Sequence, residues 1–135
     1  MNILIIDGQG GNIGSRLVKQ ILERLPECSL RAVGTNSIAT ANMLKAGAAE
    51  GATGENAAKV GCRWADVIAG PVGIVIADSL LGEVTPEMAA AVGQSSAVRV
   101  LVPMNRCETL VAGVSDTSVS ALIEDAVKKI AALAR

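Results

Sequence analysis

The feature that most constrains this chain is a glycine-rich run lying directly between a strand pattern and a helix pattern. Asn2 to Ile6 is short, apolar and β-branched, which is typical of a strand buried on both faces of a parallel sheet. Gly8 to Gly14 follows, and from Ile13 to Leu25 apolar residues recur every three to four positions, as in an amphipathic helix. This order of strand, glycine turn and helix indicates an α/β fold.

The alternation of strand and helix patterns continues to the end of the chain. Further strands are expected at 29–33, 66–69 and 98–102, with weaker candidates at 48–52 and at an edge, 109–112. Helices are expected at 38–46, after a cap at 53–56 as a short helix up to residue 60, at 85–92 and at 119–133, whereas 74–81 is apolar and ambiguous. Residues 1–135 are therefore expected to form one α/β domain, a three-layer Rossmann-like, doubly wound fold with a mostly parallel sheet of about five strands.

Charge and aromatic content argue against a nucleic-acid partner. The chain has 12 Lys and Arg against 13 Asp and Glu, a formal net charge of −1, so it lacks the positive excess that binding to a phosphate backbone requires. It has one Trp and no Phe or Tyr, so it offers almost no surface on which bases could stack. No nucleic-acid partner is expected.

Membrane and metal sites are not expected either. The first seven residues carry no basic segment before a short apolar run, and the most apolar window, 65–82, contains Asp66 and Asp78 and is interrupted by glycine and proline. Three cysteines stand far apart and the chain has no His, which disfavours a transition-metal site. The composition predicts a cytoplasmic protein without a membrane partner.

The glycine loop is predicted to hold a phosphate. Glycine permits positive φ and close approach of backbone amides to an anion, and the following helix directs its positive end to the same place. The predicted cofactor-binding residues of this loop are Gly8, Gln9, Gly10, Gly11, Asn12, Ile13 and Gly14. Glycines that serve only the geometry of the turn are the alternative.

Polar and small residues also follow the other predicted strands. Ligands of open α/β sheets bind at the carboxyl ends of the strands, so these loops are expected to line one crevice with the glycine loop. The further predicted binding residues are Arg16, Gly34, Thr35, Asn36, Ser37, Gly70, Pro71 and Asn105.

The spacing of Gly8, Gly11 and Gly14 resembles the GxxGxxG loop of the extended short-chain dehydrogenases/reductases. By resemblance, these glycines would shape the turn, admit a pyrophosphate and let the helix pack on the strand. No Asp or Glu occurs from Ser29 to Lys45, where an NAD-type site expects an acid for the ribose, so NADP or another nucleotide is predicted rather than NAD. The chain has no Tyr, so the hydride-transfer chemistry of that family does not carry over.

Four segments resemble an uncharacterised family of small bacterial proteins with a Rossmann-like fold. They are an IDGQGG opening, VGTNSIAT, GATGENA and ADSLLGE, at residues 6–11, 33–40, 51–57 and 77–83. This resemblance implies the fold and a single domain over nearly the whole length but no reaction.

Several side chains leave alternatives open. Asp78, Ser79 and Glu83 could form a carboxylate-assisted hydroxyl or be solvated helix residues or caps, and Cys107 could be a thiolate beside Arg106 or a buried apolar residue. Asp7 could direct a ribose, but capping of the loop amides is favoured.

Three functions remain in order of preference: a nucleotide-binding regulator or sensor, a small NADP-dependent or nucleotide-using enzyme, and an assembly subunit without a ligand. A mean hydropathy of +0.45 further predicts a homodimer, with interface segments at 74–81 and 88–92.

Overall fold

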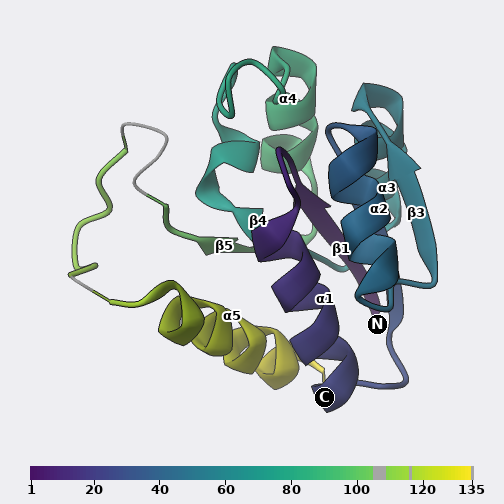
Figure 1. The fold of residues 1–135 in the computed structure, drawn as a ribbon, viewed down its shortest axis with the longest axis vertical. Coiled ribbons are helices and arrows are strands. Elements are labelled where there is room, and N and C mark those ends of the chain that lie inside the picture. Colours follow the sequence, from purple (N-terminus) through teal and green to yellow (C-terminus); the bar gives the residue numbers. More distant parts are fainter. Residues whose placement is uncertain (105–108, 116, 135) are drawn as a thin grey trace.

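The computed structural model describes residues 1–104, 109–115 and 117–134. Strands and helices alternate along these ranges (Figure 1). The elements are β1 (Asn2–Asp7), α1 (Asn12–Arg24), β2 (Ser29–Gly34), α2 (Ser37–Lys45), β3 (Glu50–Thr53), α3 (Glu55–Trp64), β4 (Val67–Pro71), the 3-10 helix η1 (Val72–Val75), α4 (Pro86–Gln94), β5 (Val98–Val102) and α5 (Val119–Leu133).

The five strands form one parallel sheet in the order β3-β2-β1-β4-β5. This is the order of the first five strands of a doubly wound Rossmann sheet. The chain starts in the middle with β1, builds outward to β3, and then crosses to the other side of β1 to build β4 and β5. The crevice expected at such a reversal lies between the carboxyl ends of β1 and β4.

Helices cover both faces of the sheet, and alternate residues of β1 enter different cores. Ile3 and Ile5 pack in the core under α1, α2 and α5, whereas Leu4 and Ile6 pack in the core under α3, η1 and α4. Successive side chains of a strand point to opposite faces, so a strand covered on both sides is apolar at every position. Coverage of β1 on both faces therefore explains why the apolar run at the N-terminus is continuous.

Most predicted elements are confirmed within a few residues. The weak strand at 48–52 is present as β3, and the helix expected to end at Val60 continues to Trp64. The ambiguous stretch 74–81 becomes the end of η1 and a series of turns.

The predicted edge strand at 109–112 is wrong. No strand is formed there, and Leu110 is 88% exposed. A short β-branched segment forms a strand only where a neighbouring strand is available for pairing. The local sequence pattern carries no information on whether such a neighbour exists.

The predicted interface segment 88–92 is also wrong in its main residues. Met88, Ala89 and Val92 lie on the buried face of α4 and pack in the core on that side of the sheet. Their apolar character therefore serves the core. No helix within the described ranges is both long and apolar enough to cross a bilayer.

Candidate functional site

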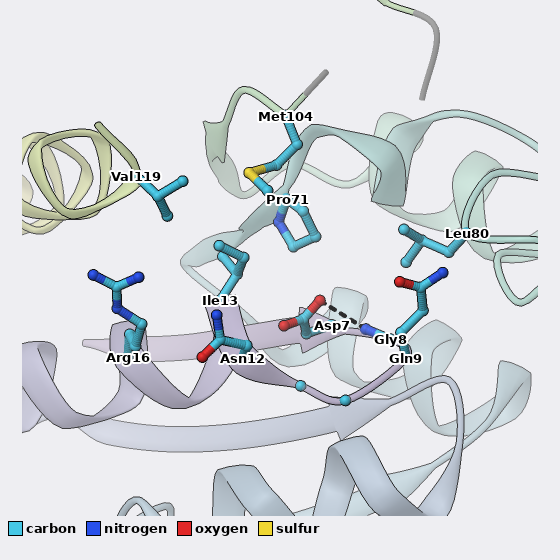
Figure 2. A pocket seen from close by; sticks show the side chains of 12 residues that line it. Asp7, Gly8, Gln9, Asn12, Ile13, Arg16, Pro71, Leu80, Met104 and Val119 are labelled. Atoms are coloured by element: carbon cyan, nitrogen blue, oxygen red, sulfur yellow. Dashed lines mark hydrogen bonds between the residues drawn. The ribbon is translucent and has the colours of Figure 1, made fainter. Parts of the chain in front are cut away.

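A pocket of about 200 Å³ lies at the carboxyl ends of β1 and β4. One side is the loop from β1 into α1, and the facing side is apolar (Figure 2). The lining residues are Asp7, Gly8, Gln9, Gly10, Gly11, Asn12, Ile13, Arg16, Pro71, Leu80, Met104 and Val119. The pocket thus coincides with the crevice that the strand order predicts.

The loop turns tightly into α1 at Gly11. This residue is the N-cap of α1, has φ 70° and ψ 22°, and its amide donates to the carbonyl of Gly8 at 2.9 Å. A Cβ at this position would lie 2.9 Å from the backbone of Ala39 in α2, so glycine is required both by the left-handed conformation and by the helix behind it.

The carboxylate of Asp7 occupies the inside of the loop. Its Oδ1 accepts a hydrogen bond from the amide of Gly8 at 2.7 Å, and its Oδ2 accepts one from the amide of Gly14 at 2.6 Å. Burial raises the pKa of Asp7, the nearby Glu83 charge adds to this, and the amides of Gly14, Gly8 and Ile13 oppose it. These contacts confirm that Asp7 caps the loop, and they occupy amides that the sequence predicts to bind a phosphate.

Glu83 accepts a hydrogen bond from a further amide of the loop, that of Gln9. Its Oε1 accepts hydrogen bonds from the amide of Gln9 at 2.8 Å, the hydroxyl of Thr35 at 2.6 Å and Nδ2 of Asn36 at 2.8 Å. Burial opposes the charged form of Glu83, but these three bonds together outweigh it and hold the pKa of Glu83 below its ordinary value. Asn36 also donates to the carbonyl of Gln9 at 2.9 Å, which ties the first two loops together.

Two amides of the loop remain available. Within the described part of the chain, no hydrogen bond is formed by the amide of Gly10 or by that of Asn12, the first residue of α1. Arg16 lies one turn further along α1 and lines the same pocket, with Nη2 donating to the hydroxyl of Ser120 at 2.6 Å. The end of the loop and the first two turns of α1 therefore present two unpaired donors and one cation to the pocket.

The structure brings together only part of the predicted set. Gly8 to Ile13, Arg16 and Pro71 line the pocket. Gly14 is buried against Asp7, Thr35 and Asn36 bind Glu83, and Asn105 lies outside the described residues. Gly34, Ser37 and Gly70 do not line the pocket: Gly34 packs against Thr40, Ser37 begins α2, and Gly70 lies against the backbone of Ile6.

Four residues that sequence reasoning does not assign to the site are part of it. Leu80, Met104 and Val119 form much of the apolar wall, and Glu83 reaches the loop from 74 residues away. A single apolar residue in a loop carries no signal that distinguishes it from any other, and a contact over such a separation has no local pattern.

Comparison with solved structures supports the fold. The chain is similar to a dodecameric FMN-dependent UbiX-like decarboxylase from Escherichia coli O157:H7, with a TM-score of 0.50 and 17% sequence identity over 96% of this chain and 76% of that chain. No curated protein sequence matches the chain. The model of the family described as "Domain of unknown function (DUF3842)" matches residues 2–135. Because that match spans nearly the whole length, the chain belongs to the DUF3842 family.

Proposed function

We propose that this protein binds a nucleotide, with one phosphate seated on the amides of Gly10 and Asn12. The observation that supports this most is that these two donors are unpaired, within the described residues, beside a pocket at the reversal of strand order. Unpaired amides at the start of a helix attract an anion because the helix dipole adds to their partial charges. Arg16 adds a full positive charge on the same side.

The opposite wall suits the rest of such a ligand. Pro71, Leu80, Met104 and Val119 supply an apolar surface across from the loop (Figure 2). Ligand pockets combine apolar walls with a few polar groups that fix orientation. A flat heterocyclic ring on this wall and a phosphate on the loop would use both sides.

The size of the pocket and the position of Glu83 favour a mononucleotide over NADP. A pocket of about 200 Å³ is small for a dinucleotide, since typical ligand pockets are about 300–1,000 Å³. The lack of an acid after β2 in the sequence favours NADP over NAD, yet Glu83 brings a carboxylate to Thr35 and Asn36, directly after β2. That charge would repel a 2′-phosphate. FMN, on which the similar decarboxylase depends, carries a single phosphate and is the first ligand to test.

Sensing or regulation is the role we propose for this binding. Asp7 and Arg16 are the only titratable groups among the described residues that line the pocket, and both Asp7 oxygens accept loop amides. A nucleotide-using enzyme is the second candidate, because Asp7 is a carboxyl group in the pocket lining whose pKa burial raises, the direction that general acid–base catalysis uses. Turnover that disappears in Asp7→Asn, with ligand affinity retained, would favour the enzyme.

The binding proposal is tested with Asn12→Asp. This change adds a negative charge at the proposed phosphate position with almost no change in size, and an acidic residue in the first turn does not destabilise α1. FMN, NADP, NAD, ATP, GTP and coenzyme A are titrated by calorimetry and thermal shift. We expect the wild type to bind a nucleotide and Asn12→Asp to bind it at least about tenfold more weakly, or about 1.4 kcal/mol.

The matched control is Asn56→Asp, the same substitution on an exposed residue in the first turn of α3. It should leave the affinity unchanged. Equal affinities for the wild type and Asn12→Asp would reject the phosphate position. Absence of binding by every nucleotide would reject the proposed function and favour the ligand-free assembly subunit.

We also propose a homodimer, through the edge of the sheet at β3. All four residues of β3 are exposed, and an edge strand has unpaired backbone groups that can pair with a second copy. Leu44 of α2 and Val60 of α3 flank this edge, 41% and 44% exposed. The apolar residues next to the edge would be buried in such a pair.

A further inference from the structure

Three hydrogen-bond donors from two loops converge on one oxygen of Glu83. We propose that this point is a second anion subsite, filled here by the protein's own carboxylate. When Glu83 leaves, the subsite takes the second phosphate of a diphosphate ligand. The diphosphate assignment rests on the proposed function, whereas the anion subsite itself does not.

The donors form a set suited to an anion. The Gln9 amide, the Thr35 hydroxyl and the Asn36 carboxamide lie 2.8, 2.6 and 2.8 Å from Oε1 of Glu83. The Gln9 amide and the Asn36 NH2 group can only donate hydrogen bonds, and the Thr35 hydroxyl donates here as well. Oxyanions are held in proteins by such groups of convergent donors, so a phosphate oxygen would satisfy all three in place of the carboxylate.

The two subsites are one residue apart. The amide of Gln9 points to Glu83, while the next amide, that of Gly10, belongs to the pair left free in the described chain. Neighbouring Cα atoms are about 3.8 Å apart. A ligand that fills both positions must therefore carry two anionic groups joined by a short bridge, which is the chemistry of a diphosphate ester.

The segment that carries Glu83 is built as a separate turn. The Asp78 amide donates to the Val84 carbonyl at 2.7 Å, so residues 78–84 close on themselves. Asp78, Leu80 and Leu81 have φ of 66°, 55° and 58°, a conformation that is costly for side chains with a Cβ. Strain of this kind persists only while other contacts hold it, and the Glu83 hydrogen bonds are such contacts.

Repulsion adds to this strain. Glu83 lies close enough to Asp7 for its charge to raise the pKa of Asp7, so two acids share one glycine loop. Leu81 is 96% exposed and does not anchor the turn. Leu80 packs against the core and Val84 is buried in it, so a phosphate with a stronger hold on the donors would displace the side chain of Glu83 and leave these two residues in place.

The test empties the subsite and refills it. Glu83→Ala removes the acceptor shared by three donors and leaves the Gln9 amide and the Thr35 hydroxyl without a partner, while Asn36 keeps its bond to the carbonyl of Gln9, so the melting temperature should fall. Added acetate or orthophosphate should restore at least about half of that loss, because an anion that binds only the folded state raises its stability. The wild type and Glu87→Ala, which removes an exposed carboxylate from α4, should show no comparable response.

A second variant ties the rescue to the donors. Glu83→Ala/Thr35→Val lacks the hydroxyl and should recover little with either anion. Equal recovery in the single and double variants, or none in Glu83→Ala, would overturn the subsite. Glu83→Gln keeps the shape of the side chain and serves where Glu83→Ala fails to fold. The carboxamide of this variant accepts hydrogen bonds more weakly than the carboxylate, so the variant should bind orthophosphate more tightly than the wild type does. An unchanged affinity for orthophosphate would count against the proposal.

The diphosphate assignment has its own measurement. Inorganic pyrophosphate should bind Glu83→Ala at least about tenfold more tightly than orthophosphate does, and Asn12→Asp should remove that advantage. If acetate rescues Glu83→Ala but pyrophosphate gains nothing, the subsite stands and the diphosphate assignment fails. If no nucleotide binds the wild type while the rescue is seen, the proposed function fails and the subsite stands.

Discussion

Asp7 and Glu83 bind the same glycine loop, yet their environments shift their pKa values in opposite directions. Asp7 is buried at the end of β1, and loss of solvation raises its pKa despite the amides of Gly14 and Gly8. Glu83 lies closer to solvent, where hydrogen bonds from Thr35, Gln9 and Asn36 outweigh its desolvation and lower its pKa. At neutral pH Glu83 therefore carries a full charge. The loop amides of Gly8, Gln9 and Gly14 already donate hydrogen bonds to the protein's own carboxylates, Asp7 and Glu83.

The glycines of the loop have different physical roles, which a matched pair of substitutions separates. A methyl group at Gly14 would lie 2.5 Å from Sδ of Met43 and 2.8 Å from Cβ of Asp7, whereas one at Gly10 meets no atom within 4 Å. We expect Gly14→Ala to lower the free energy of unfolding by about 1–3 kcal/mol, the usual cost of an overpacked core. Gly10→Ala should leave it almost unchanged, as measured by urea denaturation.

The opposite ranking would show that Gly14 is not wedged between β1 and α2. Nucleotide affinity gives an independent measurement on the same two variants. Gly10→Ala should weaken binding although its stability is normal, because a methyl group next to the Gly10 amide would crowd a phosphate bound to that amide.

The loop can be predicted from the sequence because its signal is local. The strand pattern before it, the glycine spacing and the helix pattern after it all fall within Asn2 to Leu25, and Asp7 at the end of the strand is expected to cap the amides, as it does. Glu83 could not be predicted as a partner of Gln9. Its contacts depend on how a distant turn folds over the end of β2, and no periodicity in the sequence encodes that position.

At the scale of elements, regular structure is easier to predict than the turns between elements. The Thr85 cap and Pro86 start of α4 are expected from the sequence, and the Thr85 hydroxyl accepts the amide of Met88 at 3.1 Å. The turns of residues 78–82 could not be predicted, because Leu80 and Leu81 adopt left-handed conformations that favour glycine. Propensity predicts the common conformation of a residue, so a strained turn is where it fails.

Leu81→Gly tests the strain of that turn. Leu81 has φ 58° and a side chain that is 96% exposed, so glycine would remove the cost of the left-handed conformation without losing a packing contact. Relief of the strain should raise the free energy of unfolding by about 1 kcal/mol, as measured by thermal denaturation. The greater conformational entropy that glycine gives to the unfolded chain offsets part of this gain. Ala77→Gly, at an exposed residue without positive φ, should instead destabilise the protein, and a loss in both variants would argue against strain at Leu81.

At the scale of the whole molecule, the alternation of elements determines the fold class but not the order of strands. A βα repeat is compatible with several sheet orders, and the decisive step is the crossing from β3 back to β4 on the other side of β1. That crossing places Pro71, at the end of β4, opposite the glycine loop. The predicted crevice therefore followed from a general rule for parallel sheets, while its apolar wall depended on tertiary contacts.

The same strand order leaves β3 at the edge of the sheet, where the proposed homodimer would form (Figure 1). Leu44→Lys places a charge beside that edge, and it should convert a dimer to a monomer in sedimentation or light scattering, because burying an unpaired charge opposes association. Leu133→Lys on α5 is the matched control, since Leu133 is 42% exposed and Leu44 is 41% exposed. It should leave the dimer intact. A wild type that remains monomeric at high concentration, or a dimer that survives Leu44→Lys, would show that β3 is not the interface.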